Sequence, residues 1–305
     1  MTDLTDKELI DELKKRFEQN KRALEEVHEL NNELKNANLK LEESEALKSH
    51  FISNITNEII NPFASILALS KNILSVDKEN WKKVISMISL IYSEAFNLDF
   101  QLRNIFVAAK LEAGEIYPEI LNVDIKYLID SVIESFKYVS KKKKLSISFN
   151  FNIPTEHNKP VFFKSDPEKL RLILSNLLSN AVKFSADDKS IEITASMEKK
   201  NLIISVKDNG TGISLKNQKI IFDRFKRLDS GINSINRGHG LGLSINKALL
   251  DLLNGTIKVE SSIGKGANFI ISIPENDSQA SGFSFDGNEL FFDDESILNT
   301  DSETF

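Results

Sequence analysis

The chain has 305 residues, of which 41% are hydrophobic and 28% are charged, so it is long enough for about two domains plus extensions of an ordinary soluble protein. It contains no cysteine, which excludes disulfides and thiolate metal sites and fits a reducing cytoplasm. No run of about 18 apolar residues occurs and residues 1–14 are polar, so we expect neither a membrane span nor a signal peptide.

Charge is unevenly distributed along the chain. The net charge is −6, but residues 276–305 hold eight acidic residues and no Lys or Arg, which leaves the rest of the chain at +2. A body so close to neutral argues against nucleic-acid binding. The run Lys141–Lys144 is expected to be a solvated turn and not a binding patch.

Residues 276–305 form an acidic tail that also contains five Phe residues. The composition predicts a disordered, solubilising segment. Five Phe residues are many for such a role, so docking of Phe291–Glu295 on a partner, or back on the chain itself, is the alternative.

The N-terminal segment, residues 1–48, is predicted to be a coiled-coil stalk. It has no Pro or Gly and fits a heptad frame with apolar residues at positions a and d. These residues are Ile10, Leu13, Phe17, Leu24, Val27, Leu34 and Leu41, and the frame is interrupted by Asn20, Asn31 and Asn38. Buried Asn lowers stability but fixes register and favours two strands, so we expect a parallel dimer.

Residues 49–118 are predicted to form a helical dimerisation hairpin. One helix is expected to kink at Pro62, a turn follows at residues 75–80, and a second helix runs from about Trp81 to Leu111. Each helix carries one apolar stripe. Because one hairpin cannot bury both stripes, two copies are expected to form a four-helix bundle in a homodimer.

From residue 119 to 275 the pattern becomes mixed. Helix-like periodicity occupies residues 125–139, 167–184 and 243–253. Strand-like alternation occupies residues 145–152, 190–196, 202–208, 255–261 and 267–273. This order predicts an α+β sandwich with a largely antiparallel sheet. The expected fold class is therefore multidomain, with an all-α coiled coil and four-helix bundle followed by an α+β domain.

Three short motifs in this region have chemistry that suits a nucleotide. Asn176, Asn180 and Lys183 share one helix face, where carboxamide oxygens suit Mg²⁺ and a lysine suits phosphate. Asp208–Ile213 follows a strand, so its carboxylate is placed to accept from an adenine amino group, and its glycines allow close backbone approach. Gly238–Ser244 opens a helix whose N–H groups suit phosphate oxygens.

Each motif alone also fits surface polar groups or a common turn, but all three occur in order. Together they resemble the ATP-binding domain of sensor histidine kinases of two-component signalling, a Bergerat-type (GHKL) fold also used by gyrase-type and heat-shock-chaperone ATPases. The resemblance implies ATP and Mg²⁺ as cofactors. It implies that Asn176 and Asn180 hold Mg²⁺ through ATP, that Lys183 approaches phosphate, and that Asp208 reads adenine. It also implies a pocket lined by Gly210, Gly212, Phe222, Phe225, Gly238, Gly240, Leu241 and Gly242, with a lid that follows Ile221.

The segment Phe51–Pro62 (F-I-S-N-I-T-N-E-I-I-N-P) resembles the phosphoacceptor box of the same family, except that Asn57 stands where the family has His. A carboxamide nitrogen is a poor nucleophile because its lone pair is delocalised into the carbonyl. We therefore expect no autophosphorylation at position 57. In the family, the acidic residue after His accepts its proton, and here that residue is Glu58.

The family also uses an E-x-x-[T/N] pattern to orient a water that dephosphorylates a response regulator, and Glu58 with Asn61 retains it. Phosphatase activity therefore survives in this interpretation. The alternative is that Asn61 only caps the kink before Pro62. His50, two helical turns before Asn57 on the same face, is a weaker substitute acceptor.

Four interpretations follow from the missing histidine. Asn57 was introduced deliberately to silence an active kinase, or the chain is a natural kinase-dead member that acts as a phosphatase or ATP-gated switch. Third, the chain works in a heterodimer with a His-bearing kinase. Fourth, it is a non-enzymatic scaffold that acts through its coiled coil and tail. We expect a cytoplasmic protein whose partners are a second copy and a response-regulator receiver domain.

Overall fold

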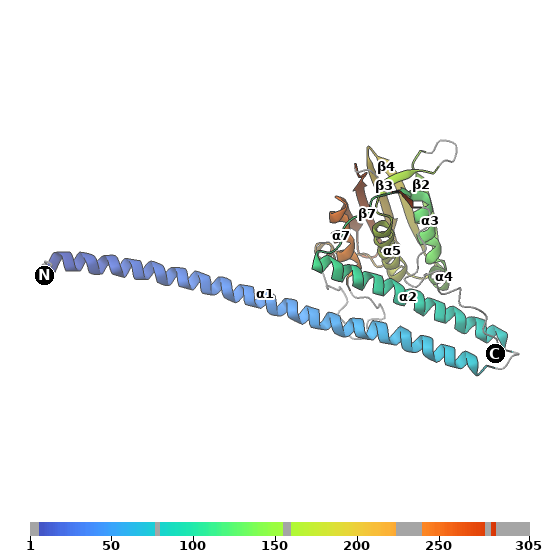
Figure 1. Ribbon diagram of the computed structural model, residues 1–305, viewed down its shortest axis with the longest axis horizontal. Coiled ribbons are helices and arrows are strands. Elements are labelled where there is room, and N and C mark those ends of the chain that lie inside the picture. The colour runs from blue at the N-terminus through green and yellow to red at the C-terminus, as the bar shows by residue number, and fades with distance from the viewer. Residues whose placement is uncertain (1–5, 77–79, 155–159, 224–239, 278–281, 285–305) are drawn as a thin grey trace. The chain divides into compact units, whose positions relative to one another are not determined.

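The structure is a computed structural model that describes residues 6–76, 80–154, 160–223, 240–277 and 282–284. It divides into two compact units, residues 1–54 and residues 55–305. Helix α1, Asp6–Leu74, begins in the first unit and ends in the second (Figure 1).

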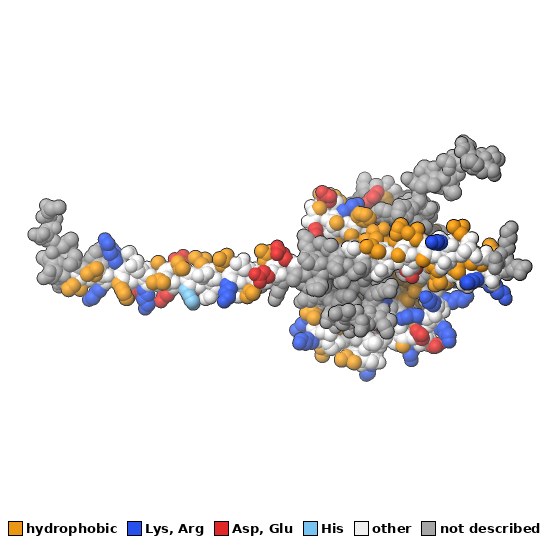
Figure 2. All heavy atoms as spheres, turned by 90° about the horizontal axis from the view of Figure 1, so that it is seen from below, with side chains coloured by type: hydrophobic (Ala, Val, Ile, Leu, Met, Phe, Trp, Pro, Cys, Tyr) orange, Lys and Arg blue, Asp and Glu red, His pale blue; other side chains and the backbone are white. Residues whose placement is uncertain are grey.

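Helix α1 is unbroken over 69 residues and continues through Pro62, so the predicted stalk and the first helix of the predicted hairpin form one helix. The predicted kink at Pro62 does not interrupt the helix. The apolar heptad residues of the stalk are all exposed in the single chain, from 51% for Ile10 to 71% for Phe17 and Leu24. Figure 2 shows hydrophobic side chains along this helix between charged ones. An exposed apolar stripe of this kind needs a partner, so the coiled-coil dimer stays a prediction that the exposure supports.

The second helix of the predicted hairpin, α2, spans Trp81–Ala113. It ends because Gly114 adopts a left-handed conformation (φ 69°) and its N–H bonds back to the carbonyl of Leu111. Large apolar side chains stay exposed on both helices of the hairpin: Ile60, Phe63, Leu67, Trp81, Ile85, Ile88, Tyr92 and Phe106. The four-helix bundle therefore also remains a prediction. No helix in the described residues is long and apolar enough to span a membrane.

The remainder of the second unit is an α+β domain built on a five-stranded sheet with the order β2-β4-β5-β7-β6. β2 runs parallel to β4, and the other neighbours are antiparallel. The strands are β2 Ser146–Asn152, β4 Ser190–Glu198, β5 Asn201–Lys207, β6 Thr256–Ser261 and β7 Ala267–Pro274. The predicted strands and the antiparallel bias are confirmed, with ends that shift by one or two residues.

Helices cover one face of this sheet and form the core with it. They are α3 Ile125–Ser135, α4 Lys137–Lys142, α5 Pro167–Phe184 and α7 Gly242–Leu252. The short helix α6, Leu215–Gln218, buries none of its residues. The core arises because alternate strand residues point to this face and meet the apolar stripes of the helices. Its most buried members include Ile125, Ile173, Leu177, Ile191, Ala195, Leu202, Leu249, Leu250 and Ile271.

The predicted helix over residues 125–139 is in fact two helices, α3 and α4, that meet at Phe136. The ring of Phe136 is buried, and it packs edge-on against Phe96 and Phe100 of α2, with ring centroids 5.5 and 6.3 Å apart. Edge-to-face rings at these distances are a favourable aromatic arrangement. Tertiary contact at Phe136 therefore accompanies a break that local periodicity does not reveal.

A second, three-stranded sheet with the order β3-β1-β8 was not predicted. β1 (Leu121–Asp124) and β3 (Phe162–Ser165) pair antiparallel, with Leu121 opposite Ser165. β8 (Phe283–Ser284) pairs parallel with β1. Strands of two to four residues carry almost no periodic signal of their own, so only their long-range pairing defines them.

Strand β8 lies within the segment that was predicted to be a disordered tail. The N–H of Asn122 donates to the carbonyl of Gly282 at 2.9 Å, and the Nδ2 of Asn122 donates to the same oxygen at 3.3 Å. The prediction of disorder is therefore wrong for residues 282–284, and this part of the tail docks on the chain itself. The Phe291–Glu295 segment lies outside the described residues.

Ending the chain after residue 281 should expose the edge of β1. The amide of Asn122 then loses its acceptor, and its hydrogen exchange should become about 3- to 10-fold faster, as expected for one hydrogen bond of ordinary strength. Hydrogen exchange measured by NMR tests this. A chain that ends after residue 284 is the matched control and should keep the protection. Equal exchange in both truncated chains would show that β8 does not hold β1.

Candidate functional site

Helix α5 carries the first motif and lies at the centre of the α+β domain. Its start is fixed by Asp166, whose side chain accepts from the N–H of Lys169, and by Pro167 in the first turn. Its boundaries are those predicted. Leu170, Ile173, Leu174, Leu177, Leu178 and Val182 bury its apolar side.

Asn176 is buried between α5 and α7 and is not a surface group. Its Nδ2 donates to the Oδ1 of Asn246 at 2.9 Å and to the carbonyl of Gly242 at 3.4 Å. Asn246, itself fully buried, donates from Nδ2 to the carbonyl of Ile173 at 3.0 Å. These contacts hold the carboxamide of Asn176 in one orientation with its nitrogen used by the protein, so Oδ1 is the atom left for a ligand.

The third motif is brought against the first at this point. A Cβ on Gly242 would lie 3.2 Å from the Oδ1 of Asn176, so glycine lets the start of α7 approach α5. Gly240 has φ 69°, and the buried Leu241 precedes the helix. Among the described residues, no side chain caps this helix. Its first N–H groups are therefore suited to a ligand that carries acceptors.

Asp208 of the second motif is buried at the end of β5. Its Oδ1 accepts from the N–H of Gly210 at 2.8 Å and from the N–H of Ala267 at 3.2 Å. Burial raises the pKa of Asp208 above its ordinary value, and these two backbone N–H groups offset part of the rise. Among the described residues Oδ2 has no hydrogen-bond partner, so it is available to a donor from a ligand.

The glycines after Asp208 allow this loop to lie against the end of α5. A Cβ on Gly210 would lie 2.4 Å from the carbonyl of Phe184, and Gly210 pairs with Ser185 as an isolated antiparallel bridge. Gly212 has φ 70°, and a Cβ there would lie 2.0 Å from the carbonyl of Ser262. Neither position accepts a side chain without movement of the backbone.

Ser185, Ser261 and Gln218 are site residues that sequence reasoning missed. The Oγ of Ser185 is buried without a partner in the described part of the chain, next to Gly210. The Oγ of Ser261 accepts from the N–H of Ile213 at 2.8 Å and donates to the carbonyl of Gly266 at 2.6 Å. Gln218 donates to the carbonyls of Ile213 and Ser261. A serine at a strand end gives no local signal that it joins two loops.

The C-terminal end of α5 is held by Lys143. Its Nζ donates to the carbonyls of Val182 and Lys183 at 2.9 Å and of Ser185 at 3.2 Å. These are the carbonyls that a helix end leaves without partners, and a cation there also complements the helix dipole. The prediction that the Lys141–Lys144 run is only a solvated turn is therefore wrong for Lys143.

Two further residues of the first motif lie along the same helix. Asn180 is half-buried one turn after Asn176. Lys183 is half-buried, and its Nζ lies 5.1 Å from the ring centroid of Phe184, a cation–π distance.

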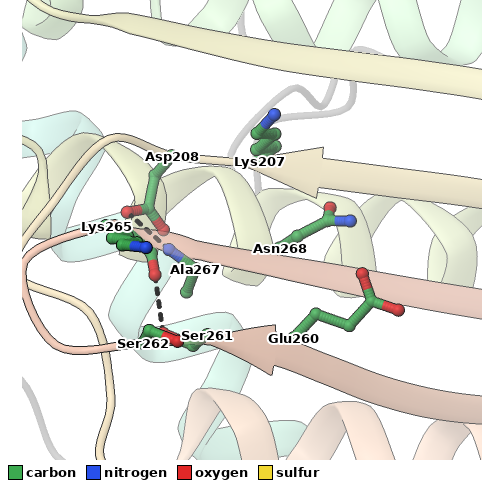
Figure 3. A pocket seen from close by; sticks show the side chains of 9 residues that line it. Lys207, Asp208, Glu260, Ser261, Ser262, Lys265, Ala267 and Asn268 are labelled. Atoms are coloured by element: carbon green, nitrogen blue, oxygen red, sulfur yellow. Dashed lines mark hydrogen bonds between the residues drawn. The ribbon is translucent and has the colours of Figure 1, made fainter.

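Asp208 also lines a hollow of about 250 Å³ together with Lys207, Glu260, Ser262, Lys265 and Asn268. Figure 3 shows these side chains. This volume falls below the roughly 300–1,000 Å³ of small-molecule pockets. The hollow also includes none of the α5 residues. We therefore place the candidate site on the α5 side of Asp208, where the motifs converge.

Several predicted site residues do not join this arrangement in the part of the chain that the structure describes. Phe225 and Gly238 lie outside the described residues, with most of the predicted lid, and Phe222 is half-buried just before that gap. Asn57 and Glu58 lie on the backbone of α1, and Asn61 is exposed on the same helix. Within the described residues, no cluster of three or more His, Cys, Asp or Glu side chains is arranged to hold a metal.

Residues 165–277 match the family described as histidine kinase-, DNA gyrase B- and HSP90-like ATPase. The match begins beside Asp166 and includes all three motifs. The chain therefore contains a histidine kinase-like ATPase domain.

Known proteins resemble the chain over a longer stretch than this ATPase domain. It is 27% identical over 260 residues to the circadian input-output histidine kinase CikA of Synechococcus elongatus, covering 83% of this chain and 33% of CikA. It is 30% identical over 259 residues to the sensor protein EvgS of Escherichia coli K12, covering 83% of this chain and 21% of EvgS. The chain thus spans a third or less of the length of these relatives.

Among solved structures, full-length ShkA in complex with AMPPNP superposes with a TM-score of 0.53. The superposition has 24% sequence identity and covers 77% of this chain and 47% of that one. At this identity the likeness shows the shared fold.

Two glycines in the β6–β7 turn of the ATPase domain test how closely that turn fits Asp208. Both have φ 77°, but a Cβ on Gly266 would lie 2.0 Å from the carbonyl of Asp208, whereas a Cβ on Gly264 meets nothing within 4 Å. Gly264→Ala should lower the free energy of unfolding by about 1–2 kcal/mol through backbone strain. Gly266→Ala should lower it by about 1–3 kcal/mol more through the overlap. Urea unfolding measures both values, and equal losses would contradict the clash.

Asp208→Asn tests the buried charge in the ATPase domain. The folded state holds the proton of Asp208 more tightly than the unfolded state, so this group contributes most stability below the unfolded pKa of about 3.9, and that contribution falls as pH rises through the raised folded pKa. At pH 7 the buried carboxylate is therefore destabilising. The asparagine oxygen keeps both N–H bonds, so the variant should unfold at equal or higher denaturant concentration at pH 7. This advantage should shrink towards pH 4. A variant that is less stable than the parent at pH 7 but equally stable at pH 4 would show that the carboxylate of Asp208 stabilises the fold at pH 7, contrary to this prediction.

Proposed function

We propose that this chain is a two-component histidine kinase-type protein that binds Mg-ATP, pairs with a second copy through α1 and α2, and communicates with a response-regulator receiver domain. The observation that carries the proposal is the convergence of three motifs on α5. Asn176 contacts Gly242 at one place, and Gly210 contacts the helix end at Phe184 and Ser185. These residues are far apart in sequence, and packing alone does not require their combination of amides, a carboxylate and glycines.

The residues around α5 fit an adenine nucleotide on three counts. Asp208 presents a carboxylate whose Oδ2 lacks a partner among the described residues and suits an exocyclic amino group. The Oγ of Ser185, buried and unpaired in the described part of the chain, is the kind of group that a ligand or an ordered water satisfies. A side chain on Gly210 or Gly242 would overlap the end of α5 or Asn176, so glycine lets the Asp208 loop and the start of α7 approach α5 and brings the three motifs together.

Each residue then has a role toward the nucleotide. Asp208 orients the base, and the uncapped start of α7 after Gly240 offers N–H groups to phosphate oxygens. Asn176 and Asn180 supply carboxamide oxygens to Mg²⁺, and Lys183 supplies positive charge beside the phosphates. The bound metal would neutralise phosphate charge and polarise the terminal phosphoryl group.

The residue at position 57 determines whether the chain retains both activities of the family, autophosphorylation and phosphatase activity, or only the second. Asn57 offers a carboxamide and not an imidazole, so the chain has no nucleophile at that position and we propose that it does not label itself there. Glu58 and Asn61 lie three residues apart on α1 and share a helix face, and Asn61 is exposed. We propose that this pair retains the phosphatase role, because orienting a water requires only a fixed hydrogen-bonding group. The decay of aspartyl phosphate on a receiver domain, compared between the parent and Asn61→Ala, tests that role.

The proposal predicts that Asn57→His restores labelling. The full chain and this variant are incubated with Mg²⁺ and γ-labelled ATP, and the acid and base stability of the label is recorded. The parent should stay unlabelled, and the variant should gain an acid-labile label because only an imidazole nitrogen forms a phosphoramidate. The double variant Asn57→His with Asp208→Asn is the control and should lose the label.

Other outcomes contradict parts of the proposal. A label on the parent places the acceptor elsewhere, with His50 as the first residue to replace. No label on Asn57→His, together with measurable ATP binding, would favour an ATP-gated scaffold. A label that appears on the histidine of a His-bearing relative only after mixing with the parent chain would favour the heterodimer.

A further inference from the structure

One buried carboxylate joins the nucleotide helix to the segment that precedes the ATPase domain. The Oδ1 of Asp166 accepts from the N–H of Lys169 at 3.0 Å, which caps α5. Its Oδ2 accepts from the Nζ of Lys169 at 2.5 Å and from the N–H of Glu119 at 2.7 Å. The side chain of Asp166 is 1% exposed and that of Lys169 is 12% exposed, so these contacts are shielded from water.

Glu119 belongs to the linker, residues 114–120, that connects α2 to β1. The linker lies before the family match, which begins at residue 165. The contact between Asp166 and Glu119 therefore joins the part of the chain that matches the ATPase family to the segment that attaches it to the helical hairpin. An ordinary helix cap needs only the Oδ1 contact, so Oδ2 has a second role.

We propose that Asp166 is a positioning residue that clamps the linker to α5, so that the chain from Glu119 onward moves with the nucleotide helix. Any movement of the ATPase domain away from the contact of Phe136 with Phe96 and Phe100 of α2 then bends the chain at residues 114–118. The consequence for phosphoryl transfer rests on the proposed function, but the clamp itself does not.

Three observations support a clamp at Glu119 and a pivot before it. A short hydrogen bond to a buried carboxylate is stronger than one between neutral groups. Immediately after Glu119, β1 pairs with β3, with Leu121 opposite Ser165, which fixes the chain a second time. At the other end of the linker, Gly114 has φ 69° and nothing lies within 4 Å of where its Cβ would be, so that end is open.

The clamp also connects the linker to the nucleotide residues. An α-helix of 18 residues is a stiff rod about 27 Å long. Asp166 lies at its start, while Asn176, Asn180 and Lys183 lie in its second half. A small rotation of α5 therefore also moves the backbone at Glu119. In the same way, a displacement of the linker at Glu119 moves the nucleotide residues on α5.

Asp166→Asn separates the clamp from the cap. Asn keeps an oxygen for the N–H of Lys169 and is itself a good N-cap, but its amide nitrogen replaces Oδ2 and faces the two donors from Glu119 and Lys169. Asp124→Asn is the matched control, because the half-buried Asp124 caps α3 through the N–H of Tyr127 at 3.0 Å and this bond is exposed to solvent. Both variants are made in the full chain, with and without Asn57→His.

In Asp166→Asn the exchange of the Glu119 amide should become about 10- to 100-fold faster, the range for losing a hydrogen bond to a charged group. Affinity for an ATP analogue should stay within about twofold, because α5 keeps its cap. Labelling of the Asn57→His chain should change by about tenfold or more, because small displacements of reacting groups have large effects on rate. Asp124→Asn should leave all three measurements close to those of the parent.

Other outcomes overturn the inference. An unchanged Glu119 amide in Asp166→Asn would show that no clamp exists. If Asp166→Asn lowered nucleotide affinity and labelling to the same extent, Asp166 would act only as a helix cap. The same conclusion would follow if Asp124→Asn had effects equal to those of Asp166→Asn. If the Asn57→His chain is never labelled, the proposed function fails, while the exchange and nucleotide measurements still decide the clamp.

Discussion

The position of helix α5 is the constraint on which the rest of the ATPase domain depends. Its apolar side packs into the core, and its two ends are held by charges of the sign that the helix dipole favours. Asp166 holds the N-terminus, and the Nζ of Lys143 holds three carbonyls at the C-terminus. Both of these residues also tie other segments to α5. Lys143 brings the α4–β2 turn to the helix, and Asp166 brings the linker.

With α5 fixed, the polar groups of the site acquire fixed positions. Asn176 and Asn246 are buried amides, and a buried amide without partners would destabilise the domain by a few kcal/mol. Their mutual bond and the carbonyls of Gly242 and Ile173 satisfy them, which also joins α5 to the start of α7. Asp208 and Ser185 are satisfied less completely within the described residues. Incomplete satisfaction of buried groups is typical of places where a ligand supplies the missing partners.

The ATPase domain and position 57 are physically independent of each other in one important respect. In the described part of the chain, the contacts that hold Asn176, Asp208, Gly210, Gly212 and Gly242 do not involve α1. The residue type at position 57 therefore does not affect the described packing around the candidate site. A chain of this design keeps the residues proposed to bind ATP whether or not it transfers a phosphoryl group, and its fold alone does not distinguish a kinase from a switch.

The sequence by itself determined the elements whose signal is local. The α5 boundaries follow from Asp166 and Pro167 at the start and a run of periodic apolar residues, and the five strands of the main sheet follow from alternation. The three nucleotide motifs were also found from sequence, because each has a local spacing. Their spatial convergence at α5 was implied only by resemblance.

The tertiary structure alone decided the features that depend on distant partners. The break at Phe136, the short strands β1, β3 and β8, and the contacts of Lys143 and Ser261 have no periodic or spacing signal. The same is true of the bond from Glu119 to Asp166, which spans 47 residues. A side chain's type restricts which partners it accepts, but only the folded chain brings one of those partners within hydrogen-bonding distance.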